Sequence, residues 1–405
     1  MSRPAAPVIR PGLTRMRSAL ARLGHPEEAF AGVLIAGTNG KGSVASLTES
    51  ALRAAGHRTG LYTSPHLVAA EERARVDGRK IPRAVAARLA RRARGAARGL
   101  TEFEIQTLVA FLWFAEAGVD IAVLEAGLGG RWDATNAFPA PEASVITSIG
   151  HDHRDWLGPT LRHIYREKRE IARPGTVLIQ NLPRFLWPES RRWAATVGVP
   201  TETLGLDFRV GAGRSTPAGE RFVLEPGGLP LRIPFRGRHQ RDNAALAARL
   251  LAALRRRGWR IPEEAARRGF AGARWPGRFE VVRRSPPAVV DGAHNVEAAA
   301  ALARAWKDLF GARRAALIFA CLRDKDAASI ARALSGVVDR VVTLDLPTPR
   351  SRSAASSASL WTPRAPAETA PSFAAAWARV KNGPVLIAGS LYLAGMALKH
   401  FGRNP

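Results

Sequence analysis

The sequence has very little cysteine and no long apolar run. Among its 405 residues, Cys321 is the only cysteine, which excludes an intramolecular disulfide and any metal site built from several cysteines. No uninterrupted apolar stretch approaches the roughly 18 residues of a membrane span. The first thirty residues carry five arginines but no apolar core, so we expect no secretory signal. These absences predict a soluble, cytoplasmic protein of a reducing compartment that has no membrane partner.

Acidic residues are also scarce relative to basic ones. The chain has 61 basic and 34 acidic residues, a formal net charge of +27, and only 7 of the basic residues are lysine against 54 arginines. Clustered positive charge attracts nucleic-acid backbones. Here the arginines are scattered through predicted helices, as in Arg88–Arg94 and Arg255–Arg257, without interleaved aromatic residues. We therefore attribute the arginine excess to genome composition and do not expect a nucleic-acid partner; small polyanionic ligands suit the charge equally well.

Apolar segments alternate with helical patterns in the first half of the chain. Hydrophobic residues make up 46% of a length that suggests two or three domains. The predicted strands are Val33–Ala36, Ile121–Leu124, Ser144–Thr147 and Thr176–Ile179, and the predicted helices are Ser43–Ala55, Pro82–Arg94, Glu104–Gly118 and Leu161–Ala172. Each strand is short and apolar on both faces, which is typical of buried parallel strands. The pattern predicts an α/β fold with a doubly wound, mostly parallel sheet.

The pattern changes near residue 200 and again near residue 272. Residues 200–236 are rich in glycine and proline with alternating apolar residues, which predicts a small antiparallel excursion before a helix at Gln240–Arg257. The turn-rich segment Gly272–Gly277 is the predicted boundary between a domain of residues 1–273 and a domain of residues 274–405. Pro347–Ala370, rich in proline, serine and alanine, is predicted to be a loop. Strand patterns return at Ala288–Val290, Ala315–Ala320, Arg340–Leu344 and Pro384–Ala388.

The strongest local pattern is a glycine-rich segment between a predicted strand and a predicted helix. It consists of Gly37, Thr38, Asn39, Gly40, Lys41, Gly42 and Ser43. Glycines let backbone N–H groups point at an anion, and a helix N-terminus favours negative charge. Lys41 can neutralise terminal phosphates, and the Ser43 hydroxyl can coordinate Mg²⁺. Because Gly42 separates the lysine from the serine, the strict phosphate-loop spacing is not met, and a plain glycine-rich turn is the alternative.

Further motifs follow this segment in order along the chain. They are Tyr62–Leu67, Glu125–Asn136, Ile149–His153, Asp155–Gly158, Arg166–Lys168, His239–Asn243, Trp275–Glu280, Asp291–Asn295, Asp324–Asp326 and Gly389–Tyr392. Together they resemble the folylpolyglutamate synthase family of the Mur ligase superfamily, over about residues 15–396. The resemblance implies a P-loop ATP-binding domain followed by a smaller, Rossmann-like C-terminal glutamate-ligase domain.

The resemblance also implies an activity. The carboxylate of dihydropteroate, or of the glutamyl tail of a reduced folate, would attack the γ-phosphate of ATP, and the amine of L-glutamate would then displace phosphate from the acyl phosphate. ATP is the implied cosubstrate, two Mg²⁺ ions are the implied cofactors, K⁺ is a further candidate, and we expect a monomer. The choice between dihydropteroate, tetrahydrofolate or both stays open. So do two alternatives, another Mur-type amino-acid ligase and a non-catalytic basic P-loop protein associated with nucleic acid.

Three residues are candidates for metal binding besides Ser43. Glu125 ends a predicted strand, at the edge where open α/β sheets bind ligands, although a glutamate there could also cap the next turn. The resemblance adds His153 and Lys168, with Lys168 carbamylated so that it offers oxygen atoms to a second Mg²⁺. An ordinary surface lysine is the alternative. His151 stands where the family usually has an aliphatic residue, and its role is open.

The remaining candidates contact nucleotide or substrate in the family. The resemblance assigns Asn243 to the adenine, Arg278 to phosphate, Asp291 to the ribose, and His294 to the same nucleotide-binding turn. Helix capping by Asn243 and turn formation by Asp291 are simpler alternatives. The substrate-binding candidates are Ser64, Pro65, His66, Thr101, Glu102, Phe103, Glu104 and Asp133.

Overall fold

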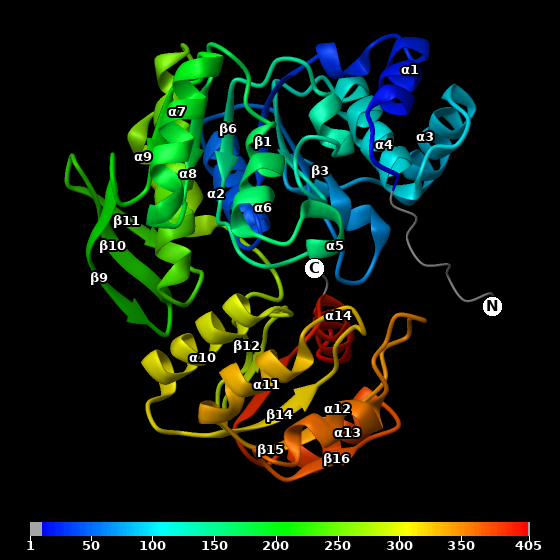
Figure 1. Cartoon of the computed structure of the whole chain (residues 1–405), viewed down its shortest axis with the longest axis vertical. Helices are drawn as coiled ribbons and strands as arrows, with labels where there is room; N and C mark the ends of the chain where they lie inside the picture. The colour runs from blue at the N-terminus through cyan, green and yellow to red at the C-terminus, as the bar shows by residue number, and fades with distance from the viewer. Residues whose placement is uncertain (1–9, 404–405) are drawn as a thin grey trace.

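Eight strands form the sheet at the centre of the first domain (Figure 1). In the computed structural model, which describes residues 10–403, the strand order is β4-β3-β2-β5-β1-β6-β7-β8. Their bounds are β1 Ala31–Ala36, β2 Thr59–Tyr62, β3 Ala74–Val76, β4 Arg79–Lys80, β5 Ile121–Glu125, β6 Ala143–Ile146, β7 Val177–Gln180 and β8 Thr201–Thr203. All pairs from β2 to β8 are parallel, whereas β3 and β4 add antiparallel strands at one edge. The doubly wound, mostly parallel sheet is confirmed.

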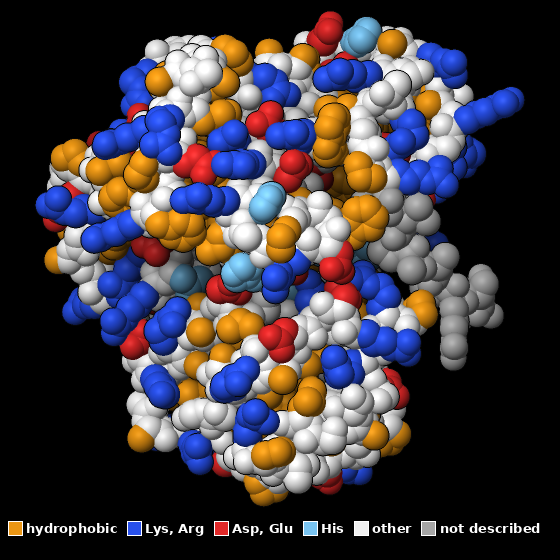
Figure 2. Space-filling view, viewed as in Figure 1, with side chains coloured by type: hydrophobic (Ala, Val, Ile, Leu, Met, Phe, Trp, Pro, Cys, Tyr) orange, Lys and Arg blue, Asp and Glu red, His pale blue; other side chains and the backbone are white. Residues whose placement is uncertain are grey.

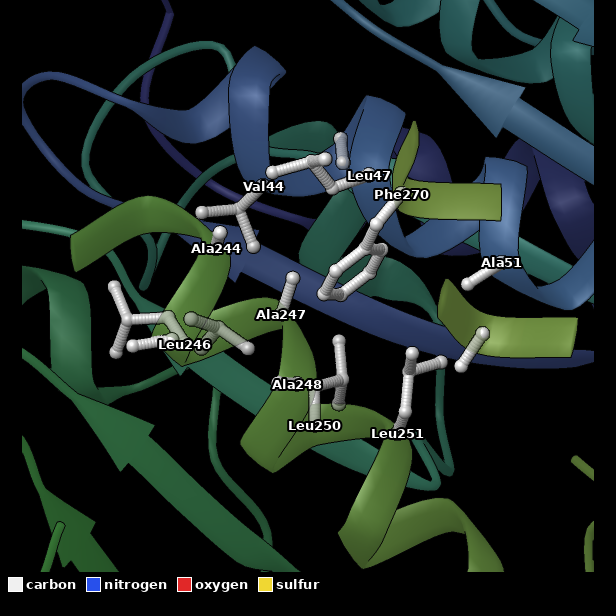
Figure 3. Packing of buried hydrophobic residues seen from close by; sticks show 14 of the residues in the cluster. Val44, Leu47, Ala51, Ala244, Leu246, Ala247, Ala248, Leu250, Leu251 and Phe270 are labelled. Carbon is white, nitrogen blue, oxygen red and sulfur yellow. The ribbon is translucent and has the colours of Figure 1, made fainter. Parts of the chain in front are cut away.

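Both faces of this sheet are covered by helices because its strands are apolar on both sides. Val33 and Ile35 of β1 pack with α2 (Lys41–Ala54), α8 (His239–Arg256) and α9 (Glu263–Gly272). Leu34 and Ala36 face the opposite layer. That layer contains α1 Thr14–Arg22, α3 Arg83–Ala96 and α4 Glu102–Glu116, and the same face continues over β6 and β7 with α6 Leu161–Arg169 and α7 Trp187–Val197. Figure 3 shows Phe270 of α9 between the apolar side chains of α2 and α8.

A small antiparallel sheet interrupts the α/β order where the sequence predicts an excursion. It contains β9 Arg209–Thr216, β10 Gly219–Glu225 and β11 Leu229–Ile233, in the order β11-β10-β9. Phe222, Leu224 and Leu231 from this sheet join the core formed by α8. The excursion therefore extends the hydrophobic core of the first domain.

The second domain has a six-stranded sheet in the order β12-β13-β17-β14-β15-β16. Its elements are β12 Glu280–Arg283, β13 Ala288–Val290, α10 Val296–Phe310, β14 Ala315–Phe319, α11 Ala327–Leu334, β15 Val338–Thr343, α12 Ala354–Trp361, β16 Ala367–Thr369, α13 Phe373–Val380, β17 Val385–Ala388 and α14 Leu391–His400. Only β12 pairs in antiparallel fashion. Leu317 and Phe319 pack with α10 and α11, and Ile318 packs with α13 and α14. Between the domains, α9 ends at Gly272 and β12 begins at Glu280.

The prediction of a loop over Pro347–Ala370 is wrong. The segment contains α12 and β16, and β16 pairs in parallel with β15. Ser353 caps α12 by accepting a hydrogen bond from Ser356 N, and Trp361 is fully buried with its ring 5.6 Å from that of Phe319. Alanine is the strongest helix former. An alanine-rich composition that is typical of linkers therefore forms a helix here, where the buried Trp361 anchors it.

The remaining described elements are short. They are α5 Arg154–Leu157 and the 3₁₀ helices η1 Pro26–Glu28, η2 Ala70–Arg73, η3 Ala134–Ala137, η4 Arg184–Leu186 and η5 Ser335–Val337. No helix in the described part of the chain combines the length and the apolarity needed to cross a bilayer. Part of the N-terminal segment in which we expect no secretory signal, including Arg3, lies outside the described residues.

Candidate active site

The glycine-rich segment connects β1 to α2 in a conformation that other residues could not adopt. Gly37 and Gly40 have φ angles of 151° and 89°. A Cβ atom on Gly37 would lie 1.9 Å from Oγ1 of Thr147, and one on Gly40 would lie 2.3 Å from Oδ1 of Asn243. A Cβ atom on Gly42 would lie 2.3 Å from the indole ring of Trp275. The glycines thus allow the end of β6, the helix α8 and the interdomain linker to approach the loop backbone.

The loop is also fixed by hydrogen bonds to the segment that follows β6. Thr38 N donates to Ser148 O over 2.9 Å, and Asn39 N donates to Ser148 Oγ over 2.9 Å. Thr147 Oγ1 donates to Asn39 O over 2.6 Å. Thr38 Oγ1 accepts a hydrogen bond from Gly150 N at 3.0 Å. The carboxyl ends of the neighbouring parallel strands therefore hold the loop at the edge of the sheet where ligands bind in this fold class.

Two lysines meet at one carbonyl oxygen of the loop. Lys41 Nζ donates to Gly37 O over 3.0 Å, and Lys168 Nζ, from α6, donates to the same oxygen over 2.9 Å. The Lys168 side chain is 4% exposed, which excludes the alternative of a surface lysine. Burial, reinforced by the charge of Lys41, lowers the pKa of Lys168 to about 7.

Glu125, at the end of β5, is a buried carboxylate close enough to Lys41 for their charges to interact. It is 4% exposed, and burial raises its pKa to about 7, against the opposing charges of Lys41 and Arg278. Its Oε2 accepts a hydrogen bond from Ser64 N at 3.3 Å, so the end of β5 is joined to the segment after β2. Ser43, in the first turn of α2, is 2% exposed. Both candidate oxygen ligands are therefore shielded from bulk water.

His153 lies beside a group of charged residues contributed by both domains. Asp152 Oδ1 is 2.6 Å from Lys325 Nζ of the second domain, and Asp152 Oδ2 is 3.7 Å from His294 Nε2. Burial alone would raise the pKa of Asp152, but the contact with His294 and the charges of His153 and Lys325 hold it well below its usual range. His153 has a left-handed φ of 52°. Partial burial and the nearby lysines lower its pKa to about 4, so its imidazole is neutral and can act as a ligand.

Other polar pairs also cross the boundary between the domains. The amides of Asn39 and Asn295 donate to each other, over 3.3 and 3.0 Å. His151 N donates to Glu297 Oε1 over 3.0 Å, so the backbone of His151 makes the interdomain contact while its side chain is exposed. Figure 2 shows histidine side chains along this boundary. Asn295, Glu297 and Lys325 could not be singled out from the sequence, because their partners are more than 140 residues away in the chain.

The predicted nucleotide residues lie around the same loop. Asn243 is the fifth residue of α8, so it does not cap that helix; its amide donates to Gln240 Oε1 over 2.8 Å. Arg278 Nη1 donates to Gly277 O over 3.0 Å, and burial lowers its pKa. Asp291 accepts hydrogen bonds from Phe279 N and Ala293 N, each at 2.7 Å. The turn-forming role weighed for Asp291 is thus present, and it orients the carboxylate toward the linker.

The predicted substrate residues make several local contacts. Thr101 caps α4 in a capping box with Glu104, whose Oε1 also accepts a hydrogen bond from Arg15 Nε at 3.1 Å. Glu102 is exposed and pairs with Arg94 at 3.1 Å. The ring of Phe103 lies against Gly127, in the loop after β5. These contacts fix the start of α4 beside the strand that ends at Glu125.

Asp133, Ser64, Pro65 and His66 belong to the loops after β5 and β2. Asp133 is 5% exposed, and its carboxylate accepts hydrogen bonds from Leu128 N at 2.8 Å and Thr135 N at 3.0 Å. His66 Nδ1 accepts a hydrogen bond from Arg73 Nε at 3.0 Å. Burial, together with the charge of Arg73, lowers the pKa of His66. The two loops therefore present polar side chains in fixed orientations.

Three potential metal-ligating side chains lie close together at a different place. Within residues 10–403, the only three His, Cys, Asp or Glu side chains whose ligand atoms lie within 4.8 Å of one another are His25, Glu27 and Glu28, around η1. Metal binding at Glu125 and His153 would therefore need ligands of other kinds, such as the Ser43 hydroxyl or oxygen atoms of a bound anion.

Two families of protein domains match the chain. The Mur ligase middle domain matches residues 35–251, and the glutamate ligase domain of the Mur ligases matches residues 277–391. The dihydrofolate synthase/folylpolyglutamate synthase of Bacillus subtilis is 36% identical over 84% of this chain and 83% of its own length. The protein of that name from Escherichia coli is 39% identical over 85% of this chain and 79% of its own length.

Solved structures agree over the whole fold. The Mycobacterium tuberculosis folylpolyglutamate synthase complexed with ADP has a TM-score of 0.92 and 32% identity, covering 98% of this chain and 96% of that one. Escherichia coli FolC in complex with DHPP and ADP has a TM-score of 0.86 and 33% identity, with 97% and 94% covered. The bifunctional Yersinia pestis enzyme complexed with AMPPNP and a Mn ion has a TM-score of 0.84 and 31% identity, with 97% and 94% covered. The chain thus belongs to the dihydrofolate synthase/folylpolyglutamate synthase family of Mur ligases, ADP-forming ligases that make a C–N bond.

Proposed function

We propose that this chain uses ATP to join L-glutamate to dihydropteroate, to the glutamyl tail of a reduced folate, or to both. The acceptor carboxylate attacks the γ-phosphorus, ADP leaves, and an acyl phosphate forms. The glutamate amine then attacks the acyl carbon, phosphate leaves, and the amine loses a proton. The observation that carries the proposal is the glycine-rich segment of residues 37–43, called the phosphate loop below. Its Lys41 interacts electrostatically with the buried carboxylate of Glu125, as does Arg278, in a chain of this family.

The residues of the loop would hold the nucleotide. The glycine backbone and the N-terminus of α2 favour a polyphosphate, and Lys41 can move its Nζ from Gly37 O to a phosphate oxygen. Arg278, which donates only to the neighbouring Gly277 O among the described residues, has donors left for phosphate. Asn243 and Asp291 are the proposed adenine and ribose contacts, and His294 links that turn to Asp152. Catalysis then consists mainly of positioning and charge neutralisation.

The side chains present are compatible with divalent metal ions. Buried Glu125 has a raised pKa and no ion-pair partner among the described residues, as expected of a carboxylate arranged to meet a cation. Ser43 and Glu125 would hold one Mg²⁺, and neutral His153 and modified Lys168 a second. Bound Mg²⁺ would neutralise charge on the phosphates. The Yersinia pestis relative, with AMPPNP and a Mn ion, supports a divalent metal in this family.

Lys168 has the properties that carbamylation requires. With a pKa near 7, a large fraction of its amine is neutral at physiological pH and can attack CO₂, giving a carbamate and a proton. The carbamate nitrogen keeps one hydrogen, so it could still donate to Gly37 O. The new anion would also relieve the repulsion between Lys168 and Lys41. We therefore propose carbamylated Lys168 as an oxygen ligand.

The decisive experiment is glutamate-dependent ADP release by the purified chain. Dihydropteroate and tetrahydrofolate are tested separately, each with and without L-glutamate, at fixed Mg²⁺ and ATP. We expect ADP release that needs both the acceptor and glutamate, with an amide product detected by mass spectrometry. Activity with one acceptor would identify a monofunctional enzyme. No release with either acceptor, combined with salt-dependent retention on DNA, would contradict the proposal and favour a nucleic-acid-associated protein.

A further inference from the structure

Three side chains that can bind a metal ion meet just before β1, around the 3₁₀ helix η1. They belong to His25, Glu27 and Glu28, and one potential ligand atom from each lies within 4.8 Å of the others. In the chain, η1 follows α1 and precedes β1. Strand β1 has six residues, which corresponds to a length of roughly 20 Å. The three side chains therefore lie at the amino end of β1, whereas the phosphate loop follows its carboxyl end.

The distances between these atoms fit one shared ion. His25 Nδ1 is 3.0 Å from Glu27 Oε1 and 3.8 Å from Glu28 Oε1. A Zn²⁺ ion binds nitrogen and oxygen ligands at about 2.0–2.2 Å, so two of its ligand atoms are at most about 4.3 Å apart. Both distances are below this limit. One ion can therefore reach the imidazole and both carboxylates after small movements of the side chains.

The carboxylate of Glu27 has an oxygen atom that no donor meets. The Glu27 side chain is 5% exposed, and within residues 10–403 its Oε2 is buried without a hydrogen-bond partner. Its Oε1 contacts His25, so the unpaired oxygen belongs to a carboxylate that points into the group of three side chains. A buried polar atom without a partner is costly, and it indicates a cation that this carboxylate is arranged to bind.

A hydrogen bond between His25 and Glu27 is the simpler interpretation of the same contact. It needs a proton on Nδ1, because an unprotonated ring nitrogen and a carboxylate oxygen would repel each other at 3.0 Å. That proton serves only Oε1 and leaves Oε2 unpaired. A metal ion in the same place can be bound by both oxygen atoms of Glu27 and also by Glu28. The ion therefore accounts for more of the arrangement than the hydrogen bond does.

The mixture of ligands selects the kind of ion. An imidazole nitrogen suits Zn²⁺ and related transition metals, whereas Mg²⁺ prefers oxygen ligands. The side chains of His25 and Glu28 are 49% and 64% exposed, so an ion has access from solvent and water can complete its coordination. A transition-metal ion is thus favoured over the Mg²⁺ that the phosphate loop would use.

We propose that His25, Glu27 and Glu28 form a site for one transition-metal ion of the Zn²⁺ type, separate from the magnesium sites of the ligase. On binding, the ion displaces the Nδ1 proton of His25 to solvent and ties the segment after α1 to the start of β1. A ligand of the folded chain raises its stability by mass action, so Zn²⁺ should raise the melting temperature. The site does not depend on the proposed function.

The test is calorimetric titration of Zn²⁺ into the parent chain with excess Mg²⁺ present, so that the proposed catalytic metal sites are occupied. We expect one Zn²⁺ bound per chain. Loss of a residue that only orients a ligand typically weakens metal binding 10- to 100-fold, so the loss of a ligand in His25→Gln or Glu28→Gln should weaken it about 100-fold or more. Glu264→Gln, which removes the same charge from a side chain 83% exposed on α9, is the matched control and should bind Zn²⁺ as the parent does.

Two outcomes of this titration would overturn the site. One is the absence of Zn²⁺ binding by the parent, and the other is equal affinity in the parent, His25→Gln and Glu28→Gln. Loss of binding in His153→Gln, with retention in His25→Gln, would also count against it, because the ion would then lie at the active site. If His25→Gln does not fold, Glu28→Gln supplies the same comparison, and the melting temperature without metal shows whether each variant is folded.

Discussion

The phosphate loop and the domain boundary are built by different kinds of interaction. The loop is fixed by backbone hydrogen bonds and by glycines whose neighbours leave no room for a side chain, above a core in which α2, α8 and α9 interlock. The boundary near the loop is held by pairs of polar side chains, such as Asp152 with Lys325 and Asn39 with Asn295. Tight packing permits few alternative arrangements, whereas polar pairs can exchange with water. We therefore expect the loop side of the site to be preformed and the second domain to move relative to it.

The largest effect is expected at the preformed half. Lys41→Ala should lower the turnover number by about 10³-fold, because one preorganised cation at a developing phosphate charge is typically worth 10²–10³ or more. The substitution leaves the buried apolar residues of α2 unchanged, so the melting temperature should stay near that of the parent. ADP release and thermal melting are the measurements, with Lys80→Ala on β4 as the control. Parent-like turnover in the folded Lys41→Ala protein would remove the basis of the phosphate-loop assignment.

A loss of about 10²-fold is expected for Lys168→Arg. A guanidinium group keeps the positive charge and cannot become a carbamate, so the proposed second metal would lack a ligand. Kinetics at saturating bicarbonate and Mg²⁺ measure the effect, and ATP binding should be retained. If the arginine variant turned over like the parent, Lys168 would be only a buried cation, and the second metal would have other ligands.

Replacing Lys168 by an apolar residue should make the folded chain more stable, although replacing it by arginine lowers activity. Lys168→Met should raise the free energy of unfolding by about 3 kcal/mol below pH 7, because the unmodified lysine is then charged in both states but desolvated only when folded. The gain should shrink as the pH rises from about 7 toward 10.5, where the lysine is neutral in both states. Chemical denaturation without nucleotide or bicarbonate, at pH 6.5 and 9.5, measures it. An equal gain at both pH values would argue against the lowered pKa of Lys168.

At the boundary, Lys325→Met should lower kcat/KM for ATP about tenfold. The ion pair is largely buried, with side chains 8% and 12% exposed, and its loss leaves the Asp152 carboxylate with only histidine neighbours. The substitution should weaken the contact between the two domains. The free energy of unfolding of the first domain alone should therefore change little. Lys307→Met, an exposed lysine on α10, is the control. A loss as large as that of Lys41→Ala would mean that activity depends on the domain boundary as strongly as on the phosphate loop.

The smallest effect is expected for Arg238→Gln. Arg238 makes two hydrogen bonds to Asp308, at 2.9 and 3.0 Å, but its side chain is 72% exposed. Exposed ion pairs contribute about 0–1 kcal/mol, so kcat/KM should change less than about fivefold. The same ADP-release assay measures it. A tenfold loss would mean that the boundary depends on its exposed contacts as much as on its buried one.

The secondary structure and the loop could be predicted because their signals are local. Helix α2 begins two residues before the predicted Ser43, and β1 ends at the predicted Ala36. Apolar runs and glycine positions report on a residue's own neighbourhood in the chain. The loop prediction for Pro347–Ala370 was wrong because it also relied on local composition alone. Composition does not reveal that Trp361 packs against Phe319 of β14 and so anchors α12.

The contacts between distant residues could not be predicted from one sequence. Lys325 and Asp152 are 173 residues apart, and Asn295 and Asn39 are 256 apart. The motifs containing these residues were recognised, but the pairing of their side chains is decided by how the two sheets face each other.

The contact between Leu67 and Gly395 has a consequence for how a finished product leaves. The loop after β2 lies against α14 with no space for even a methyl group, so the two domains are in direct contact beside this loop. We therefore expect product release to require separation of the two domains at this contact. A Gly395→Ala enzyme, in which a methyl group props the loop away from α14, should release product faster than the parent.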